Sequence, residues 1–262
     1  MQRQVAVITG ASSGIGAALA EALAARGTQV VLVARSAARL EEVAERLRSA
    51  GAIAHVLPMD LAEAGAAQSL HAAIRAMGLA VDTLINNAAI GHYGPFEAEP
   101  RERLTQALHL NVVALAELTR LFVPELLLRK GTILNIASTA ALQPTPFMSS
   151  YGATKAFVLS FSEALWAEYH HRGLHVAALC PGPVETPFID AMGPGVRRTA
   201  IFRKTMPIEA VVKAGLKALD STRPTRILGA GNWVSAQMIR FAPRALTARL
   251  SAAMLKPREF NQ

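Results

Sequence analysis

The stretch Thr9-Gly10-Ala11-Ser12-Ser13-Gly14-Ile15-Gly16 decides the fold of this chain. It lies between a short apolar run, Val5–Thr9, and a helical pattern that extends from about Ile15 to Arg26. Glycines permit a tight turn here, and the N-terminus of the following helix offers free N–H groups and a positive dipole end to a pyrophosphate. The spacing Gly-x-x-x-Gly-x-Gly differs from the common Gly-x-Gly-x-x-Gly pattern, so a plain glycine turn is the alternative interpretation.

Short apolar runs continue to alternate with longer helical patterns along the chain. These runs are rich in β-branched residues and lack polar alternation, which is typical of strands buried on both faces of a parallel sheet. We therefore predict one doubly wound, Rossmann-like α/β domain with a parallel sheet of about seven strands. The expected strands after the first are Gln29–Ala34, Ile53–Leu57, Thr83–Ile85, Thr132–Ala137, His175–Cys180 and, as a possible seventh, Ile227–Leu228.

We assign residues 1–230 to this domain, with a substrate lid at about residues 187–206. Residues 231–262 are expected to form a basic, amphipathic C-terminal extension of the same domain. Helices are predicted over Trp233–Phe241 and Arg244–Leu255, because Pro243 interrupts the helical pattern.

An apolar stripe follows the last of these helices. Leu246, Leu250 and Met254 recur at intervals of four residues and therefore share one helix face. This stripe either packs on the body of the protein or a partner subunit, or contacts a membrane surface.

Composition and charge narrow the class of protein. Of the 262 residues 52% are apolar and 18% charged, which excludes intrinsic disorder. The net charge is +8, and residues 221–262 carry seven Lys or Arg residues against Glu259 alone. Such a basic tail suits anionic lipid, nucleic acid or simply water. Because it lacks interleaved aromatics and any known nucleic-acid motif, we expect no nucleic-acid partner.

The single cysteine, Cys180, makes intrachain disulfides impossible and favours a reducing compartment. The N-terminal residues lack the apolar region of a signal peptide, and no run of about 18 uncharged apolar residues occurs. We expect a cytoplasmic protein, with possible peripheral contact at the inner membrane surface.

Ala34 and Arg35 end the second expected strand and bear on the choice of cofactor. An acidic residue at this position would bind the ribose hydroxyls of NAD, which Ala34 cannot do. Arg35 can face a 2′-phosphate instead, and a charge-assisted contact contributes about 1.5–3 kcal/mol. The pair therefore favours NADP(H) over NAD(H) by roughly 10- to 100-fold, unless Arg35 is only a solvated charge.

The stretch Tyr151-Gly-Ala-Thr-Lys155 opens a helix and places a phenol and an ammonium on one face. We expect Lys155 to lower the pKa of the phenol from about 10, which would make Tyr151 a usable proton carrier. Ser138 ends the strand before this helix and can donate a hydrogen bond to a carbonyl oxygen.

Taken together, these motifs resemble those of the short-chain dehydrogenase/reductase family over about residues 5–190. The chain has, in the order typical of that family, the glycine turn, Asp60-Leu61, Asn86-Asn-Ala-Ala89, Asn111, Ser138, Tyr151 with Lys155, and Pro181-Gly-Pro-Val-Glu-Thr186. So many motifs at family spacing make the resemblance specific.

The resemblance implies a role for each matching residue. Tyr151 would be the general acid/base, Ser138 would position the substrate carbonyl, and Lys155 would bind the nicotinamide ribose. Asn111 would hold a water that connects Lys155 to solvent. The implied cofactor-binding residues are Gly10, Ser12, Ser13, Gly14, Ile15, Gly16, Arg35, Asp60, Leu61, Asn87, Ala88, Ala89, Tyr151, Lys155, Pro181, Gly182, Val184 and Thr186.

One departure is Ala89, which stands where the family usually has glycine. A finer resemblance is to a bacterial branch of the DltE or YqjQ type, through Gly91-His-Tyr-Gly-Pro-Phe96, the segment 149–157 and the basic tail.

The family resemblance implies hydride transfer between a nicotinamide cofactor and a carbonyl compound or secondary alcohol. Apolar residues in the expected lid and neighbouring loops favour a lipophilic small molecule. The candidate pocket residues are His92, Tyr93, Phe147, Phe188, Met192 and Phe202. No histidine or acidic cluster has metal-ligand spacing, so no metal is expected.

One alternative accompanies this hypothesis. The chain could bind NADP as a catalytically silent scaffold of the same fold. Self-association as a homo-dimer or homo-tetramer is also expected, because the helix from Tyr151 carries Phe157, Phe161, Leu165 and Trp166 around much of its circumference.

Overall fold

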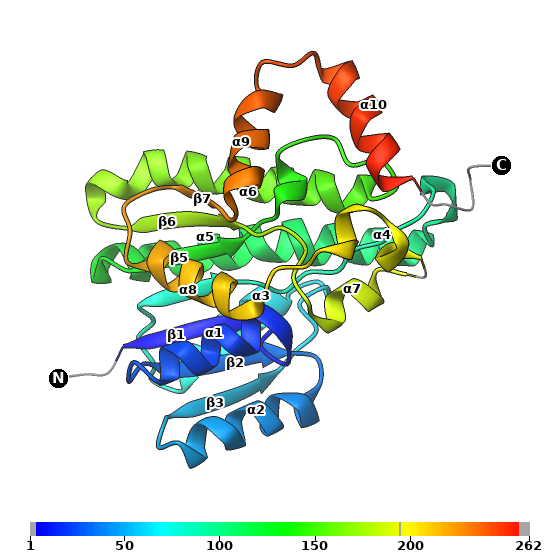
Figure 1. Ribbon diagram of the computed structural model, residues 1–262. Coiled ribbons are helices and arrows are strands. Elements are labelled where there is room, and N and C mark those ends of the chain that lie inside the picture. Colours follow the sequence, from blue (N-terminus) through cyan, green and yellow to red (C-terminus); the bar gives the residue numbers. More distant parts are fainter. Residues whose placement is uncertain (1–3, 194, 257–262) are drawn as a thin grey trace.

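Seven parallel strands form the centre of the computed structural model, which describes residues 4–193 and 195–256 (Figure 1). The strand order is β3-β2-β1-β4-β5-β6-β7, so the direction of winding reverses between β1 and β4. Ligands bind at such a reversal, beyond the carboxyl ends of the strands. The strands are β1 (Val5–Thr9), β2 (Gln29–Ala34), β3 (Ala54–Pro58), β4 (Thr83–Asn86), β5 (Thr132–Ile136), β6 (His175–Cys180) and β7 (Thr225–Ile227).

Helices cover both faces of the sheet, as the uninterrupted apolar strands predict. One face is covered by α1 (Gly14–Ala24), α2 (Ala37–Ser49) and α8 (Ile208–Leu219), and the other by α3 (Ala66–Ala76), α5 (Leu115–Arg129) and α6 (Ser149–Tyr169). A shorter helix, α4 (Arg101–Leu108), precedes α5.

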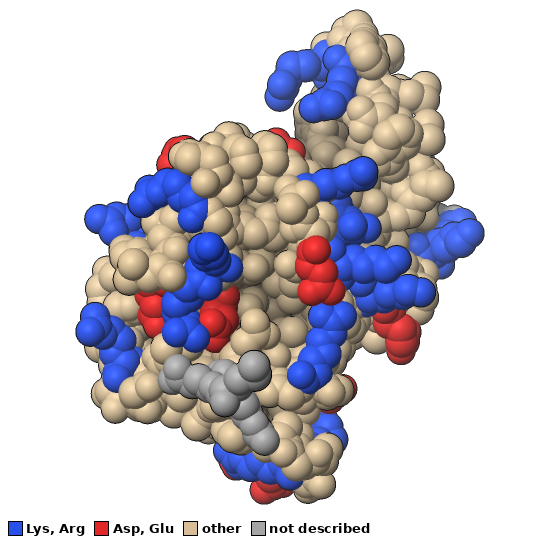
Figure 2. All heavy atoms as spheres, turned by 90° about the vertical axis from the view of Figure 1, so that its left-hand side faces the viewer, with Lys and Arg blue, Asp and Glu red and all other residues tan. Residues whose placement is uncertain are grey.

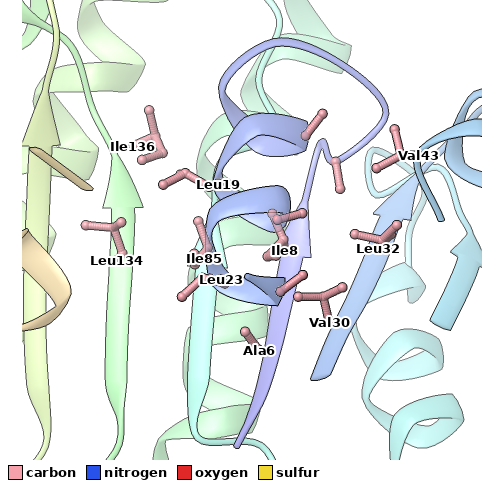
Figure 3. Close-up of a cluster of buried hydrophobic side chains, with 14 of the residues drawn as sticks. Ala6, Ile8, Leu19, Leu23, Val30, Leu32, Val43, Ile85, Leu134 and Ile136 are labelled. Atoms are coloured by element: carbon pink, nitrogen blue, oxygen red, sulfur yellow. The ribbon is translucent and has the colours of Figure 1, made fainter. Parts of the chain in front are cut away.

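Alternate residues of each strand supply the two apolar cores. In β1, Ile8 packs in the cluster beneath α1, whereas Val7 packs in the cluster beneath α3 and α5. Figure 3 shows Leu19 and Leu23 of α1 over Ile8 and strand residues on its neighbours. The doubly wound α/β prediction is therefore confirmed.

A buried polar network ties the central strands to the helices that carry the site. Asn86 at the end of β4 donates through Nδ2 to Asn135 Oδ1 of β5 (2.9 Å) and to Thr119 Oγ1 of α5 (3.2 Å). Asn135 in turn donates to Ser162 Oγ of α6 (2.8 Å), which donates to the Val158 carbonyl (2.6 Å). These bonds pair most of the buried polar atoms of the network, whereas Asn86 Oδ1 has no hydrogen-bond partner among the described residues.

The C-terminal segment forms two helices, α9 (Ala230–Ile239) and α10 (Arg244–Leu255), which project beyond the layers of the sheet (Figure 1). The bounds of α10 match the prediction. The predicted Trp233–Phe241 helix begins three residues earlier, and the seventh strand lies at Thr225–Ile227 rather than Ile227–Leu228. Among the described residues, no helix has the length and apolar content needed to cross a membrane.

Candidate active site

The glycine turn between β1 and α1 closes so tightly that two of its glycines have no room for a side chain. A Cβ on Gly16 would lie 2.3 Å from the Gly10 carbonyl oxygen, and one on Gly10, whose φ is +67°, would lie 2.8 Å from Asn87 Nδ2. Only glycine meets both demands. The turn thus exposes backbone N–H groups at the start of α1, as an anionic cofactor requires.

Asn87 and Thr9 brace this turn against the end of β4. The Asn87 amide donates to the carbonyls of Thr9 (2.9 Å) and Gly10 (3.2 Å), while Thr9 Oγ1 accepts from the backbone N–H groups of Asn87 and Ala88 (3.0 Å each). Asn87 therefore supports the shape of the turn, in addition to lining the cavity beside it.

One cavity of about 1030 Å³ begins at the glycine turn and extends across the carboxyl ends of the strands to the C-terminal helices. This volume is large enough for a dinucleotide cofactor, and the tight glycine turn also fits such a group. Of the predicted cofactor-binding residues, Gly16 alone does not line it, because it is packed beneath the turn. The others all do: Gly10, Ser12, Ser13, Gly14, Ile15, Arg35, Asp60, Leu61, Asn87, Ala88, Ala89, Tyr151, Lys155, Pro181, Gly182, Val184 and Thr186.

The far end of the cavity, beyond β2, is basic. Arg35 Nη1 lies 3.8 Å from Asp60 Oδ2, and its side chain is largely exposed. Ser36 caps α2 by accepting from the Arg39 backbone N–H (3.4 Å), and the Ser36 and Arg39 side chains also line the cavity. Sequence reasoning missed Arg39, although its position in the first turn of α2, four residues after Arg35, was a signal that could have identified it.

At the other end, Ser138, Tyr151 and Lys155 come together. Ser138 follows β5, and its Oγ accepts from the Ala140 N–H (3.1 Å), which fixes the hydroxyl at the start of a short 3₁₀ turn. Tyr151 and Lys155 lie one turn apart in α6, and Lys155 Nζ donates to the Ile136 carbonyl (2.6 Å). The three side chains therefore face one cavity.

Burial dominates the titration of this group. It raises the pKa of Tyr151 to about 12, against an opposing hydrogen bond with Ser138, and it lowers the pKa of Lys155 to about 8. The expectation that Lys155 lowers the phenol's pKa is therefore wrong for this structure. Desolvation of the buried phenolate is the largest cause and outweighs the hydrogen bond with Ser138.

Asn111 is not among the residues that line the cavity. It lies in a π-helical stretch, His109–Ala114, between α4 and α5. Its amide accepts from the Ile90 N–H (3.0 Å) and donates to the Ile90 carbonyl (2.8 Å) and Thr154 Oγ1 (3.1 Å). The side chain joins the loop after β4 to α6 and braces that loop, and the expected role of Asn111 in holding a water stays a prediction.

The segment after β6 lines part of the cavity. Val184 forms a parallel bridge with Met206, and Thr186 Oγ1 donates to the Val184 carbonyl (3.3 Å). The expected lid, residues 187–206, contains α7 (Pro187–Ala191) and two 3₁₀ turns; residue 194 lies outside the described residues.

Three of the six predicted pocket residues, Phe188, Met192 and Phe202, line the cavity. The Phe188 and Tyr151 rings lie 5.6 Å apart. The prediction is wrong for His92, Tyr93 and Phe147, because none of them lines the cavity. Tyr93 is buried, and its hydroxyl instead donates to the Leu255 carbonyl of α10 (2.8 Å). Phe147 packs into the cluster around Tyr93, Met148 and Tyr151.

Two contributions to the cavity were missed from the sequence. Arg103 of α4 lines it and donates to the carbonyls of Gly91 (2.7 Å) and Ala191, which joins the loop after β4 to α7. The C-terminal extension supplies a wall through Asn232, Ser235, Ala236, Ile239, Met254 and Leu255. Spacing along the chain contains no signal for either contact, since both depend on tertiary folding.

Comparison with known proteins identifies the family of this chain. The family model described as short chain dehydrogenase matches residues 4–196. A very-long-chain 3-oxoacyl-CoA reductase of Anas platyrhynchos is 39% identical over 189 residues, which are 69% of this chain and 60% of the relative. Several other eukaryotic relatives have the same name. The chain thus spans about three fifths of the length of the first of these relatives.

Two solved structures match nearly the whole chain. A short-chain dehydrogenase from Sphingobium yanoikuyae in complex with NADPH is 34% identical, with a TM-score of 0.81, and the match covers 91% of this chain and 93% of that one. A short chain dehydrogenase/reductase from Burkholderia phymatum in complex with NAD is 27% identical, with a TM-score of 0.80 and coverage of 90% and 92%.

These relatives do not confirm the finer resemblance to the DltE or YqjQ branch, which stays a prediction. The family itself is shown, because its model matches well over half of the sequence and the site motifs meet around one cavity. The chain belongs to the short-chain dehydrogenase/reductase family.

Proposed function

We propose that this protein is an NADP(H)-dependent oxidoreductase that interconverts a lipophilic carbonyl compound and the corresponding secondary alcohol. One observation carries the proposal: a single cavity has the glycine turn at one end and Ser138, Tyr151 and Lys155 at the other. A bound nicotinamide cofactor would supply or accept the hydride, and the protein would supply orientation and proton transfer.

The side chains divide this work by their chemistry. Tyr151, which burial keeps protonated, is suited to give a proton to the oxygen of a carbonyl group during reduction. Ser138 Oγ would donate a hydrogen bond to the same oxygen. Lys155 would hold the cofactor's ribose and, in its protonated form, favour negative charge on the neighbouring oxygens.

The basic end of the cavity supports a preference for NADP(H). Arg35 and Arg39 both line it, and the start of α2 at Ser36 adds free N–H groups and a positive dipole end. Ala34, at the end of β2, has no carboxylate to bind a ribose diol or repel a phosphate. One solved relative holds NADPH and another NAD, so the support for NADP(H) comes from these residues of the chain itself.

Apolar walls support a lipophilic substrate. Phe188, Ile189, Met192 and Phe202 of the expected lid line the cavity together with Ile239 and Met254 of the extension. The name of the Anas platyrhynchos relative refers to a very-long-chain 3-oxoacyl thioester, a substrate with the same lipophilic character. We infer a ketone, aldehyde or secondary alcohol with a bulky apolar substituent.

Self-association remains an expectation of the proposal. In α6, Val158 and Ser162 are fully buried, whereas Phe157 stays partly exposed and stacks on Phe161 with ring centroids 5.3 Å apart. A homo-dimer or homo-tetramer would cover this aromatic pair, and light scattering on the purified protein would determine its mass.

Thermal unfolding with NADPH and with NADH tests the proposal. A ligand at 100 times its dissociation constant adds about 2.7 kcal/mol of stability, or roughly 5–10 °C for a chain of this size. We expect the larger shift with NADPH, and a loss of that difference in an Arg35→Gln/Arg39→Gln variant. Equal stabilisation by NADH would refute the cofactor preference. Stabilisation without turnover of any lipophilic carbonyl would favour the silent scaffold instead.

A further inference from the structure

We propose that the two projecting helices, α9 and α10, dock on an anionic lipid surface. We call residues 230–256, which contain both helices, the arm. The arm extends beyond the sheet layers, and its two helices are joined at the free end (Figure 1). This surface is separate from the cofactor end of the cavity.

The outer face of α9 is apolar although it is exposed. Ala236 is buried and Ile239 lines the cavity, so this side of the helix faces the body. At 100° per residue, Val234 and Met238 lie on the opposite side. Met238 is 67% exposed, and Phe241, which follows the helix, is 90% exposed. A helix that is apolar on both sides needs a second apolar environment.

In α10 the usual arrangement of side chains is inverted. The small polar residues Thr247 and Ser251 are buried, whereas Leu246 and Leu250 are 49% and 59% exposed. Burying polar groups while leaving leucines in water is unfavourable for an isolated helix pair. The leucine face therefore indicates a surface that is covered when the protein functions.

The charges of the arm identify the partner as anionic. Arg240, Arg244, Arg249 and Lys256 are all exposed, and residues 221–256 contain no Asp or Glu. Figure 2 shows the projection as a largely uncharged surface with Lys or Arg side chains toward its free end. Exposed apolar side chains beside arginines match the interfacial region and anionic headgroups of a bilayer.

A second copy of the chain fits this surface less well. A two-fold interface places the same patch of each subunit against itself. Two arms paired in that way would bring four cations from each copy together with no carboxylate from either arm between them. A lipid surface offers the missing negative charge and takes up the apolar side chains as well.

The arm also forms a wall of the cavity, because Ala236, Ile239 and Met254 line it. Docking would place this wall at the lipid surface, where a lipophilic substrate is concentrated. This last step rests on the proposed function, whereas docking itself does not.

Flotation of the full-length protein with vesicles tests the docking directly, without reference to turnover. The vesicles are pure phosphatidylcholine, or phosphatidylcholine with part replaced by phosphatidylglycerol. We expect binding to the anionic vesicles only. Replacing Arg240, Arg244 and Arg249 with Gln should weaken it roughly fivefold per arginine, or about 100-fold together. Met238→Ser/Phe241→Ser should abolish it.

Matched variants control for charge and for exposed apolar area elsewhere. Arg75→Gln/Arg120→Gln/Lys213→Gln removes the same charge from other exposed sites, and Leu108→Ser/Leu128→Ser removes exposed leucines from α4 and α5. Both should bind like the wild type, and every variant should keep the wild-type melting temperature to show that it folds.

Failure of the wild type to float, or equal losses in the control variants, would overturn the proposal. A change from dimer to monomer in Met238→Ser/Phe241→Ser, without vesicle binding by the wild type, would show that the arm covers a second subunit instead. If the wild-type protein floats with anionic vesicles but does not bind NADPH, the proposed function is refuted and the docking proposal stands.

Discussion

The Lys155 ammonium lies 5.8 Å from the centre of the Tyr151 ring, and its hydrogen bond goes to the Ile136 carbonyl. The two groups share one buried space, and burial moves their pKa values toward the neutral form of each. The site is therefore prepared with a protonated phenol and an ammonium that loses its proton easily. This state suits proton donation to a carbonyl oxygen more directly than proton removal from an alcohol.

A pH dependence of stability follows from Lys155. Its pKa is about 8 in the folded protein and 10.5 in the unfolded chain, so between these values the unfolded chain binds more protons. The free energy of unfolding should then rise with pH, by about 1.4 kcal/mol per pH unit from this group alone. Below pH 8 both states are protonated, and the group adds no slope.

Two other buried groups oppose this rise at higher pH. Burial raises the pKa of Tyr151 and of Cys180 to about 12, so the folded protein keeps these protons longer than the unfolded chain does. Urea unfolding at a series of pH values should therefore show a rise between about pH 8 and 9 and a decline above about pH 10. In Lys155→Met the rise should disappear; a rise that persists would show that another group causes it.

Replacing Tyr151 by Phe should remove turnover and preserve cofactor binding. The phenol is the only group proposed to give a proton to the substrate oxygen, and general acid catalysis contributes about 10²- to 10⁴-fold. The ring, which packs against Phe188, stays in place. Steady-state assays together with the NADPH-induced thermal shift separate these effects. Loss of the shift would indicate misfolding, and undiminished turnover would refute the assignment.

The sequence predicted those parts of the site that depend on local order along the chain. The glycine turn and Ser138 lie at strand ends, and Tyr151 and Lys155 lie in the first two turns of α6. Sheet topology then brings these strand ends and helix starts together. Arg103 could not be found in this way, because its contact with Ala191 joins residues far apart in sequence.

The predictions that the structure contradicts failed for a common physical reason. Tyr93 occurs near family motifs, yet its hydroxyl donates to the Leu255 carbonyl rather than facing the cavity. The predicted shift in the pKa of Tyr151 had the wrong direction. Sequence spacing indicates which charges lie near the phenol, whereas the depth of its burial depends on the whole fold.

Gly16→Ala should damage both stability and cofactor binding. Its Cβ would lie 2.3 Å from the Gly10 carbonyl oxygen and 2.5 Å from Asn87 Nδ2, so the turn must open to admit it. We expect a loss of roughly 1–3 kcal/mol in stability and a reduced NADPH-induced shift. Gly231→Ala is the control, since its Cβ would meet nothing within 4 Å. Equal effects of the two variants would contradict the tight turn.

Asn135→Ala tests the buried network that joins the strand ends to α6. The variant removes the acceptor of Asn86 Nδ2 and the donor to Ser162 Oγ, both in the fully buried centre of the protein. Unpaired buried polar groups cost about 1–3 kcal/mol each, so we expect a loss of roughly 2–5 kcal/mol in urea unfolding. Ser162→Ala should cost less, because it removes one of these bonds.

A double-mutant cycle then separates coupling from simple loss of volume. If Asn135 and Ser162 stabilise the protein through their shared 2.8 Å hydrogen bond, the double variant should lose less stability than the two single variants combined. The difference should amount to at least about 0.5 kcal/mol. Strictly additive losses would mean that α6, and with it Tyr151 and Lys155, is held against β5 by apolar packing rather than by this network.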